Sequence, residues 1–232
     1  LALVGLILDK MYSEVVFPNL RNVRKAPEPS QTYGELKYPV VSRLLADRSI
    51  TEDSLVVDIG SGVGNVVLQV VLAYGCRVIG CELIEARHTV AQQLVNEGLQ
   101  VASRDFSGIF GVMEDLIDRV ELRQGDAFSD AATLSRLRVA DLIICNNVKF
   151  PPDLLEKQIS AVLGVMKSGA TFVSFARIVM GKLTTRKKVL KALNVRERSY
   201  KGCIGDCSWK HEGVDYWVYT KKIPVDRKKG RP

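Results

Sequence analysis

The segment Asp58-Ile-Gly-Ser-Gly-Val-Gly-Asn65 constrains the fold of this chain more than any other feature. It overlaps the end of the apolar run 54–58 and leads into a nearly continuous apolar stretch, 65–74, that stops at Gly75. Glycines between a buried strand and a helix let the backbone turn tightly and come close to a ligand. The segment therefore predicts a strand, a ligand-binding turn and a helix, which together form the opening unit of an α/β fold.

Further apolar runs of strand length recur along the chain and alternate with helical patterns. The later strands are expected at 77–82, 119–123, 140–145, 171–175 and 215–220. The helices are expected at 1–20 with a break at Pro18, at 38–47, at 65–74, at 84–118 with an interruption around Gly98 or Gly108, and at 154–166. Strands that alternate with helices predict a parallel, doubly wound sheet.

Acidic residues end two of the expected strands and follow a third. Asp58 and Glu82 close the first two strands, and Asp126 comes just after the third. The carboxylate of Asp58 would repel a pyrophosphate, and Asn65 stands where a dinucleotide fingerprint needs a small residue, so a dinucleotide dehydrogenase is the weakest interpretation. Asp58 suits a cationic amino-acid group, Glu82 suits ribose hydroxyls and Asp126 suits the exocyclic amine of adenine. With the glycine turn, these acids predict S-adenosylmethionine as cofactor and S-adenosylhomocysteine as product.

The segment Asn146-Asn-Val-Lys-Phe150 follows the fourth expected strand, where an open parallel sheet places its chemistry. Two asparagines can also simply form a turn, and spacing alone does not decide between these readings. A nucleic-acid amino-methyltransferase would carry Asn or Asp directly before Pro-Pro and an aromatic residue, but here the Pro-Pro pair follows Phe150. A non-catalytic chromatin-binding module is a further alternative, against which the intact acids Asp58 and Glu82 argue.

Four separate patches carry a resemblance to a known family. They are Thr32-Tyr-Gly-Glu35, the glycine turn, Asn146–Phe150, and Ser208-Trp209 with Tyr216 seven positions after the tryptophan. In these patches and in their order the chain resembles the disruptor-of-telomeric-silencing family, the non-SET histone lysine methyltransferases. The resemblance implies a Rossmann-like class I S-adenosylmethionine-dependent methyltransferase fold. That fold has a mostly parallel seven-stranded sheet, helices on both faces and a small N-terminal helical extension.

The resemblance also implies roles for individual residues. Those implied to contact the cofactor are Tyr33, Glu35, Asp58, Gly60, Gly62, Asn65, Glu82, Asp126, Ala127 and Asn146. Those implied to line a narrow channel and position the substrate lysine are Asn146, Phe150, Trp209 and Tyr216. For Trp209 and Tyr216 the alternative is cross-strand packing in a hairpin.

The substrate that the resemblance implies is a lysine in the globular core of histone H3, presented on the nucleosome. The chain departs from the family's pattern at two places. Ala127 follows Gly-Asp where the family often has an aromatic residue, and Phe128 comes next. After the fifth expected strand the chain has Ser174-Phe-Ala-Arg177, where the family usually has serine followed by Leu-Lys. These departures concern the adenine side of the pocket and one wall of the channel.

The charge of the chain favours a polyanionic partner, because Lys plus Arg outnumber Asp plus Glu by 33 to 26 and give a net charge of +7. One basic cluster comprises Lys182, Arg186, Lys187, Lys188, Lys191, Arg196, Arg198 and Lys201. A second lies in the C-terminal tail and comprises Lys221, Lys222, Arg227, Lys228, Lys229 and Arg231. A solvated helix face is the usual meaning of such a run. With the resemblance, the clusters predict DNA contacts on the nucleosome, a nuclear location and a monomeric enzyme.

The expected organisation is an N-terminal helical extension and loop over 1–34, a catalytic domain over 35–222 and a basic tail over 223–232. The apolar segment Leu1–Leu8 is shorter than the roughly 20 residues that span a bilayer, so we expect a buried helix and no membrane partner. The cysteines and the two histidines do not supply the ligand set of a zinc site, so we expect no metal and reduced thiols.

Overall fold

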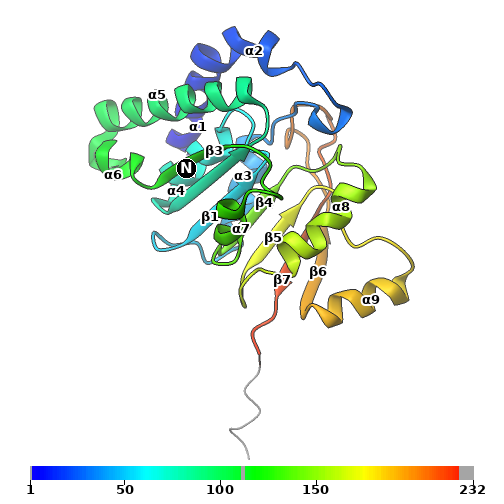
Figure 1. The fold of residues 1–232 in the computed structure, drawn as a ribbon. Coiled ribbons are helices and arrows are strands. Elements are labelled where there is room, and N and C mark those ends of the chain that lie inside the picture. Colours follow the sequence, from blue (N-terminus) through cyan, green and yellow to red (C-terminus); the bar gives the residue numbers. More distant parts are fainter. Residues whose placement is uncertain (1, 111–112, 225–232) are drawn as a thin grey trace, which may run out of the picture.

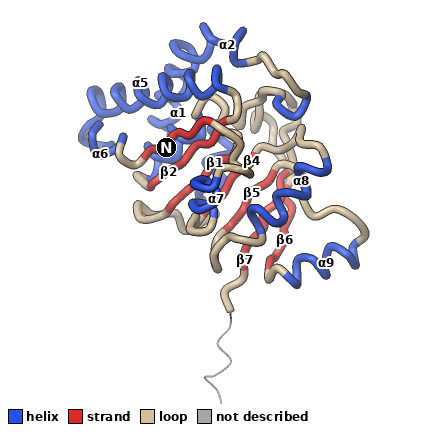
Figure 2. The backbone as a smooth tube through the Cα atoms, in the orientation of Figure 1, coloured by secondary structure: helices blue, strands red, loops and turns tan. Residues whose placement is uncertain are grey.

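A computed structural model describes residues 2–110 and 113–224 and contains a seven-stranded sheet (Figures 1 and 2). The strands are β1 (Leu55–Ile59), β2 (Arg77–Glu82), β3 (Val120–Gln124), β4 (Leu142–Cys145), β5 (Thr171–Ser174), β6 (Val195–Tyr200) and β7 (Tyr216–Lys221). Their order across the sheet is β3-β2-β1-β4-β5-β7-β6. The first five strands are parallel, and β7 is antiparallel to both β5 and β6. The predicted mostly parallel seven-stranded α/β sheet is confirmed.

Helices cover both faces of this sheet because both faces of its strands are apolar. On one face lie α3 (Tyr38–Ala46), α4 (Asn65–Tyr74) and α5 (Glu85–Phe110), whose buried residues share a core with Val56 and Val78. On the other face lie α7 (Ala131–Leu137), α8 (Pro152–Gln158) and α9 (Leu183–Ala192), which pack with Val57 and Ile79. Successive residues of a central strand thus enter two different cores, which fixes the register of the sheet.

The N-terminal segment is helical further than the sequence predicts. It runs through α1 (Ala2–Met11), a π-helical turn (Tyr12–Val16) and α2 (Phe17–Val23), and packs across α4 and α5. The predicted break at Pro18 is wrong. Pro18 lies in the first turn of α2, and the two residues before it, Val16 (φ −76°, ψ −48°) and Phe17 (φ −56°, ψ −46°), keep helical backbone angles, so the chain stays helical from the π-helical turn into α2.

Of the two places predicted for an interruption of the long helix α5, the structure has a kink near Gly108 and none at Gly98. Gly98 does not interrupt it: a Cβ atom there would lie 2.4 Å from Leu68 Cδ2, so this glycine lets α5 and α4 approach closely. The kink falls at Phe106, whose φ and ψ are −143° and 31°, and a short helix α6 (Met113–Ile117) follows. Helix α8 likewise ends early and continues as a π-helical turn over Ile159–Leu163.

Strand β6 has no counterpart in the sequence prediction. Apolar and polar residues do not alternate along it, because only Val195 of the six residues is buried and the rest are polar or aromatic. Arg196 and Arg198 belong to the first basic cluster, and clusters of this kind usually lie on a solvated helix face. In the structure both residues lie on β6, which is an edge strand of the sheet. Charged residues on an edge strand prevent pairing with other chains.

Within residues 2–110 and 113–224, no helix has both the length and the apolar character needed to cross a membrane. The tail cations Arg227, Lys228, Lys229 and Arg231 lie outside the described residues.

Candidate active site

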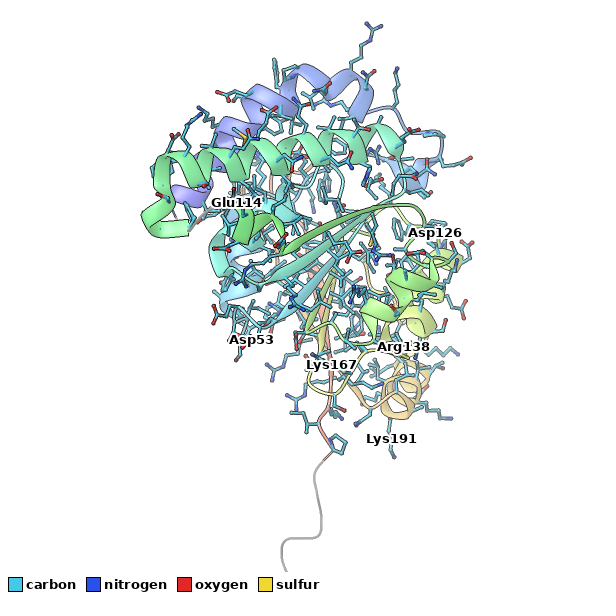
Figure 3. All side chains as sticks on the ribbon, turned by 60° about the vertical axis from the view of Figure 1, so that its left-hand side comes forward. Asp53, Glu114, Asp126, Arg138, Lys167 and Lys191 are labelled. Atoms are coloured by element: carbon cyan, nitrogen blue, oxygen red, sulfur yellow. The ribbon has the colours of Figure 1, made fainter. Side chains whose placement is uncertain are left out.

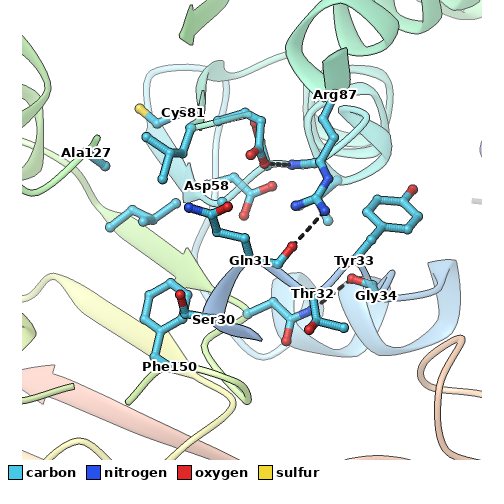
Figure 4. A pocket seen from close by; sticks show the side chains of 18 of the residues that line it. Ser30, Gln31, Thr32, Tyr33, Gly34, Asp58, Cys81, Arg87, Ala127 and Phe150 are labelled. Atoms are coloured by element: carbon cyan, nitrogen blue, oxygen red, sulfur yellow. Dashed lines mark hydrogen bonds between the residues drawn. The ribbon is translucent and has the colours of Figure 1, made fainter. Parts of the chain in front are cut away.

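A cavity of about 240 Å³ opens at the carboxyl ends of β1, β2 and β4 (Figure 4). The chain crosses from β1 to β2 on one side and from β4 to β5 on the other, so the cavity lies at the point where the strand order reverses. Open parallel sheets bind their ligands in this crevice. Among the predicted residues, those that line it are Tyr33, Glu35, Asp58, Gly60, Gly62, Asn65, Glu82, Asp126, Ala127, Asn146 and Phe150.

The glycine turn forms the floor of the cavity. Gly60, Gly62 and Gly64 have φ angles of 74°, 56° and 82°, a left-handed region that favours glycine. The amides of Gly60 and Ser61 donate to the carbonyl of Cys81 at 2.8 and 3.0 Å, which ties the turn to the end of β2. A Cβ atom on Gly60 would meet nothing within 4 Å, so bare backbone faces the space that a ligand would occupy.

Two buried carboxylates stand beside this turn in different surroundings. Glu82 accepts hydrogen bonds from the amides of Gly62 and Ile84, each at 2.8 Å. Asp58 is only 3% exposed, and burial, reinforced by the nearby charge of Glu82, raises its pKa to about 7. The two carboxylates make the site electronegative, and a neighbouring cation would favour the ionised form of Asp58.

The segment 23–35, named here the strap, runs from the end of α2 to the rim of the cavity. At its end, Tyr33 donates a hydrogen bond from its hydroxyl group to Glu35. Burial raises the pKa of both side chains, and the charge of Glu35 raises that of Tyr33 further. Asn146 Nδ2 donates to the Gly34 carbonyl at 3.0 Å, and Ser208 exchanges hydrogen bonds with the backbone of Glu35 at 2.9 and 3.0 Å. The strap is therefore fixed to the loop after β4 and to the loop before β7.

On the opposite side of the cavity, the loop after β3 presents an aromatic side chain. The Asp126 carboxylate accepts from the Phe128 amide at 2.9 Å and from Ser129 Oγ at 2.9 Å, which stabilises this turn. Phe128 is buried and meets Phe150 edge-on, with ring centroids 6.4 Å apart and an interplanar angle of 84°. Ala127 lines the cavity too, but Phe128 supplies its aromatic surface here.

The two asparagines after β4 have separate partners. Asn147 is fully buried and its side chain bonds to Gln158, to Ser174 Oγ and to the Ala176 amide, at 2.7 to 3.1 Å. It joins the ends of β4 and β5 to α8, which frees Asn146 to face the cavity. Neither this division nor the linking contacts of Ser208 could be predicted from the sequence.

The structure places the two late aromatic residues outside the cavity lining. The Trp209 ring packs on Gly34, where an added Cβ atom would come within 2.6 Å of Trp209 Cε3. Tyr216 is 5% exposed and stacks on its cross-strand partner Tyr200, with ring centroids 5.1 Å apart, and it also lies against Phe175. The structure thus packs Trp209 on the strap at Gly34 and Tyr216 on its cross-strand partner.

The described residues contain no group of three or more His, Cys, Asp and Glu side chains arranged to hold a metal ion. Cys203 and Cys207 are free thiols, and Cys207 Sγ lies 3.5 Å from the Lys210 carbonyl.

Two solved methyltransferase structures have a similar arrangement. An RNA methyltransferase from Salinibacter ruber in complex with S-adenosyl-L-homocysteine has a TM-score of 0.54 at 19% identity and covers 85% of this chain and 99% of its own. An O-methyltransferase from Bacillus cereus, also in complex with S-adenosylhomocysteine, has a TM-score of 0.56 at 15% identity and covers 90% and 89%. At these identities the likeness shows the fold alone.

Sequence relatives are more specific. Proteins from Gibberella zeae and Emericella nidulans, each named histone-lysine N-methyltransferase, H3 lysine-79 specific, are 30% identical to 95% and 93% of this chain. The chain spans only 43% and 42% of their lengths. A sequence model of the family described as Histone methylation protein DOT1 matches residues 12–221, and this chain therefore belongs to that family.

Proposed function

We propose that this chain transfers a methyl group from S-adenosylmethionine to the side-chain amine of a lysine in the globular core of histone H3 on the nucleosome. The observation that supports this proposal most strongly is the cavity at the point where the strand order reverses. There the glycine turn meets the buried carboxylates of Asp58 and Glu82. The relatives' names, which specify lysine-79 of histone H3, support this choice of substrate. Such a substrate entails action on chromatin, and we propose a nuclear, monomeric enzyme without a membrane partner.

The residues of the cavity fit S-adenosylmethionine. The open backbone at Gly60 admits a ligand at van der Waals distance, and the raised pKa of Asp58 indicates a site that gains from a bound ammonium group. When bound, this cofactor supplies an electrophilic methyl group on a sulfonium. Asp58 would accept from the ammonium group and Glu82 from the ribose hydroxyls, while Asp126 would meet the adenine amine. Phe128 would provide the apolar surface for the adenine ring, in place of Ala127.

The other cofactor assignments concern the walls. Tyr33 and Glu35 close the strap side of the cavity, and Gly62 holds Glu82 in place through its amide. Asn65 donates from Nδ2 to the Leu36 carbonyl at 2.8 Å, so it ties the residues after the strap to the start of α4.

We assign substrate positioning to the side of the cavity formed by Asn146 and Phe150. An amine must be neutral to attack, and the ordinary lysine pKa is about 10.4, so a channel that excludes water favours the reactive form. Alignment of the amine with the methyl group can lower the barrier by roughly 7–11 kcal/mol without a general base. Trp209, through its packing on Gly34, and Tyr216, through Phe175, would support this wall from behind.

Basic surface away from the cavity would engage nucleosomal DNA. Helix α9 carries Arg186, Lys187, Lys188 and Lys191, has no acidic residue and buries none of its side chains (Figure 3 labels Lys191 on its outer side). Arg196 and Arg198 are exposed on the neighbouring strand β6. Each phosphate contact by such side chains adds to affinity and to its dependence on salt.

One experiment tests the proposal directly. Labelled S-adenosylmethionine is offered with intact nucleosomes, free histones and naked DNA, and the modified residue is located by mass spectrometry. We expect label on an H3 core lysine, mainly with intact nucleosomes. Label on DNA would instead indicate a nucleic-acid methyltransferase. Cofactor binding without transfer to any of the three would indicate a non-catalytic chromatin module.

A further inference from the structure

Arg87 is a buried arginine at the edge of the cofactor cavity, and it is not among the residues assigned to the cofactor or to the substrate. It projects from the first turns of α5, is 5% exposed and is the one cation among the residues that line the cavity in the described part of the chain. Burial of an arginine requires that its donors find acceptors, because a desolvated guanidinium is costly.

The acceptors of Arg87 are backbone carbonyl groups. Nε donates to Val23 O at 2.9 Å, and Nη2 donates to Gln31 O at 2.7 Å and approaches Lys25 O at 3.4 Å. The guanidinium also lies 5.3 Å from the centroid of the Tyr33 ring, a cation–π distance. Figure 4 shows Arg87 between the Gln31 backbone and Tyr33. All four contacts are with the strap.

The remaining bonds of residues 23–31 are local. The amides of Lys25 and Gln31 donate to Asn22 and Glu28, within the end of α2 and the 3₁₀ turn (Pro29–Gln31). Among the hydrogen bonds of the described chain, those that join residues 23–31 to elements beyond α2 come from Arg87. Asn146 and Ser208 hold only the far end of the strap, at Gly34 and Glu35.

We propose that Arg87 is a positioning residue for the methyl donor: it holds the strap over the cavity so that Tyr33 and Glu35 already stand at the binding site. The inference rests on the proposed function and concerns its cofactor step. A planar guanidinium can meet several carbonyls and an aromatic face at once, which a lysine ammonium group cannot do in the same geometry. Without this clamp residues 23–31 keep only local hydrogen bonds, so the closed strap is less populated before the donor binds, and apparent affinity falls with the fraction that is already closed.

The test uses Arg87→Lys, which keeps the charge, and Arg87→Met, which keeps the length. The matched control is Arg119→Met, because the Arg119 guanidinium also donates to a backbone carbonyl, that of Gly75, away from the cavity. Calorimetry gives the Kd of S-adenosylhomocysteine, kinetics with nucleosomes give KM for the donor and kcat, and hydrogen exchange reports on residues 23–35. Thermal unfolding shows which variants are folded.

We expect both Arg87 variants to raise the Kd and the KM by about tenfold or more, with kcat at saturating donor changed less than about threefold. Strap amides should exchange faster in both. The Arg119 variant should unfold at a lower temperature with its Kd within about twofold of wild type. A folded Arg87→Met protein with wild-type Kd would overturn this inference but not the proposed function. An equal loss of affinity in the Arg119 variant would do the same. A wild-type protein that binds no S-adenosylhomocysteine would remove the proposed function as well.

Discussion

Replacement of Asp58 by asparagine should stabilise the empty protein and disable its cofactor site at the same time. Asp58 is 3% exposed, and burial together with Glu82 raises its pKa to about 7 from an ordinary 3.8. A carboxyl group whose pKa is raised by folding destabilises the folded state once the pH exceeds the unfolded-state value. Asparagine has nearly the same shape and carries no charge, so it removes this cost.

The size of the effect follows from the two pKa values. At about 1.36 kcal/mol per pH unit, a rise from 3.8 to about 7 corresponds to about 4 kcal/mol near pH 8. For a domain of this size that is a rise in Tm of roughly 8–16 °C. The difference in unfolding free energy between variant and wild type should shrink as the pH falls through about 7, and it should be below about 2 kcal/mol near pH 5. At pH 5 Asp58 is protonated in the folded protein, and only the unfolded chain gives up the proton.

Binding should change in the opposite direction. The variant lacks the charged acceptor for the ammonium group, so the Kd of S-adenosylhomocysteine should rise by about tenfold to a hundredfold. In wild type the affinity itself should weaken below about pH 7, by nearly tenfold per pH unit, because donor binding then requires Asp58 to lose its proton. Calorimetry across this pH range measures both effects.

Denaturant unfolding of Asp58→Asn at about pH 5 and 8 supplies the stability values, with Asp53→Asn as the control, since Asp53 is an exposed carboxylate outside the cavity. The control should stay within about 0.5 kcal/mol of wild type at both pH values. If Asp58→Asn were no more stable than wild type near pH 8, or if its advantage did not depend on pH, the argument from burial would be refuted. Unchanged affinity for S-adenosylhomocysteine would refute the assigned role.

Three further predictions address other parts of the molecule. Asn146→Ala should leave Tm within about 3 °C of wild type but reduce methylation of nucleosomes at least about tenfold; unchanged turnover would refute its role in positioning. Gly98→Ala should destabilise the fold by about 1–3 kcal/mol, because its Cβ would collide with Leu68, and it should cost less when it is made in a Leu68→Ala protein. Nucleosome binding should weaken steeply with salt, and Lys187→Gln with Lys188→Gln should flatten the slope by about 1–2; a slope identical to wild type would exclude α9 from the interface.

The sequence was sufficient for the centre of the fold and of the site. Asp58 and Glu82 could be placed in one cavity from the sequence, because parallel neighbouring strands end at the same edge and each acid closes a short apolar run. The glycine turn between them has three glycines at alternate positions, a pattern that few other local structures require. In both cases the information is local, since a strand end or a turn is encoded within a few residues.

What the sequence missed depends on partners far along the chain. Strand β6 carries no apolar alternation, since it is held by pairing with β7 rather than by burial of its own side chains. Arg87 binds carbonyl groups 56 to 64 residues away, and a backbone carbonyl leaves no mark on the residue type that presents it. Likewise, Tyr216 packs on Tyr200 because the expected strand β7 pairs with the unforeseen strand β6.

The different surroundings of Asp58 and Glu82 also indicate which carboxylate senses the charge of the donor. Glu82 accepts from two backbone amides, Gly62 and Ile84, so its position is determined before any ligand arrives. Such an anchored carboxylate can accept hydrogen bonds from hydroxyl groups without moving. Asp58 has a raised pKa and gains most from a neighbouring cation. The glycine turn therefore does more than admit the ligand: its Gly62 amide fixes the position of Glu82, beside the buried Asp58 whose ionisation is coupled to binding.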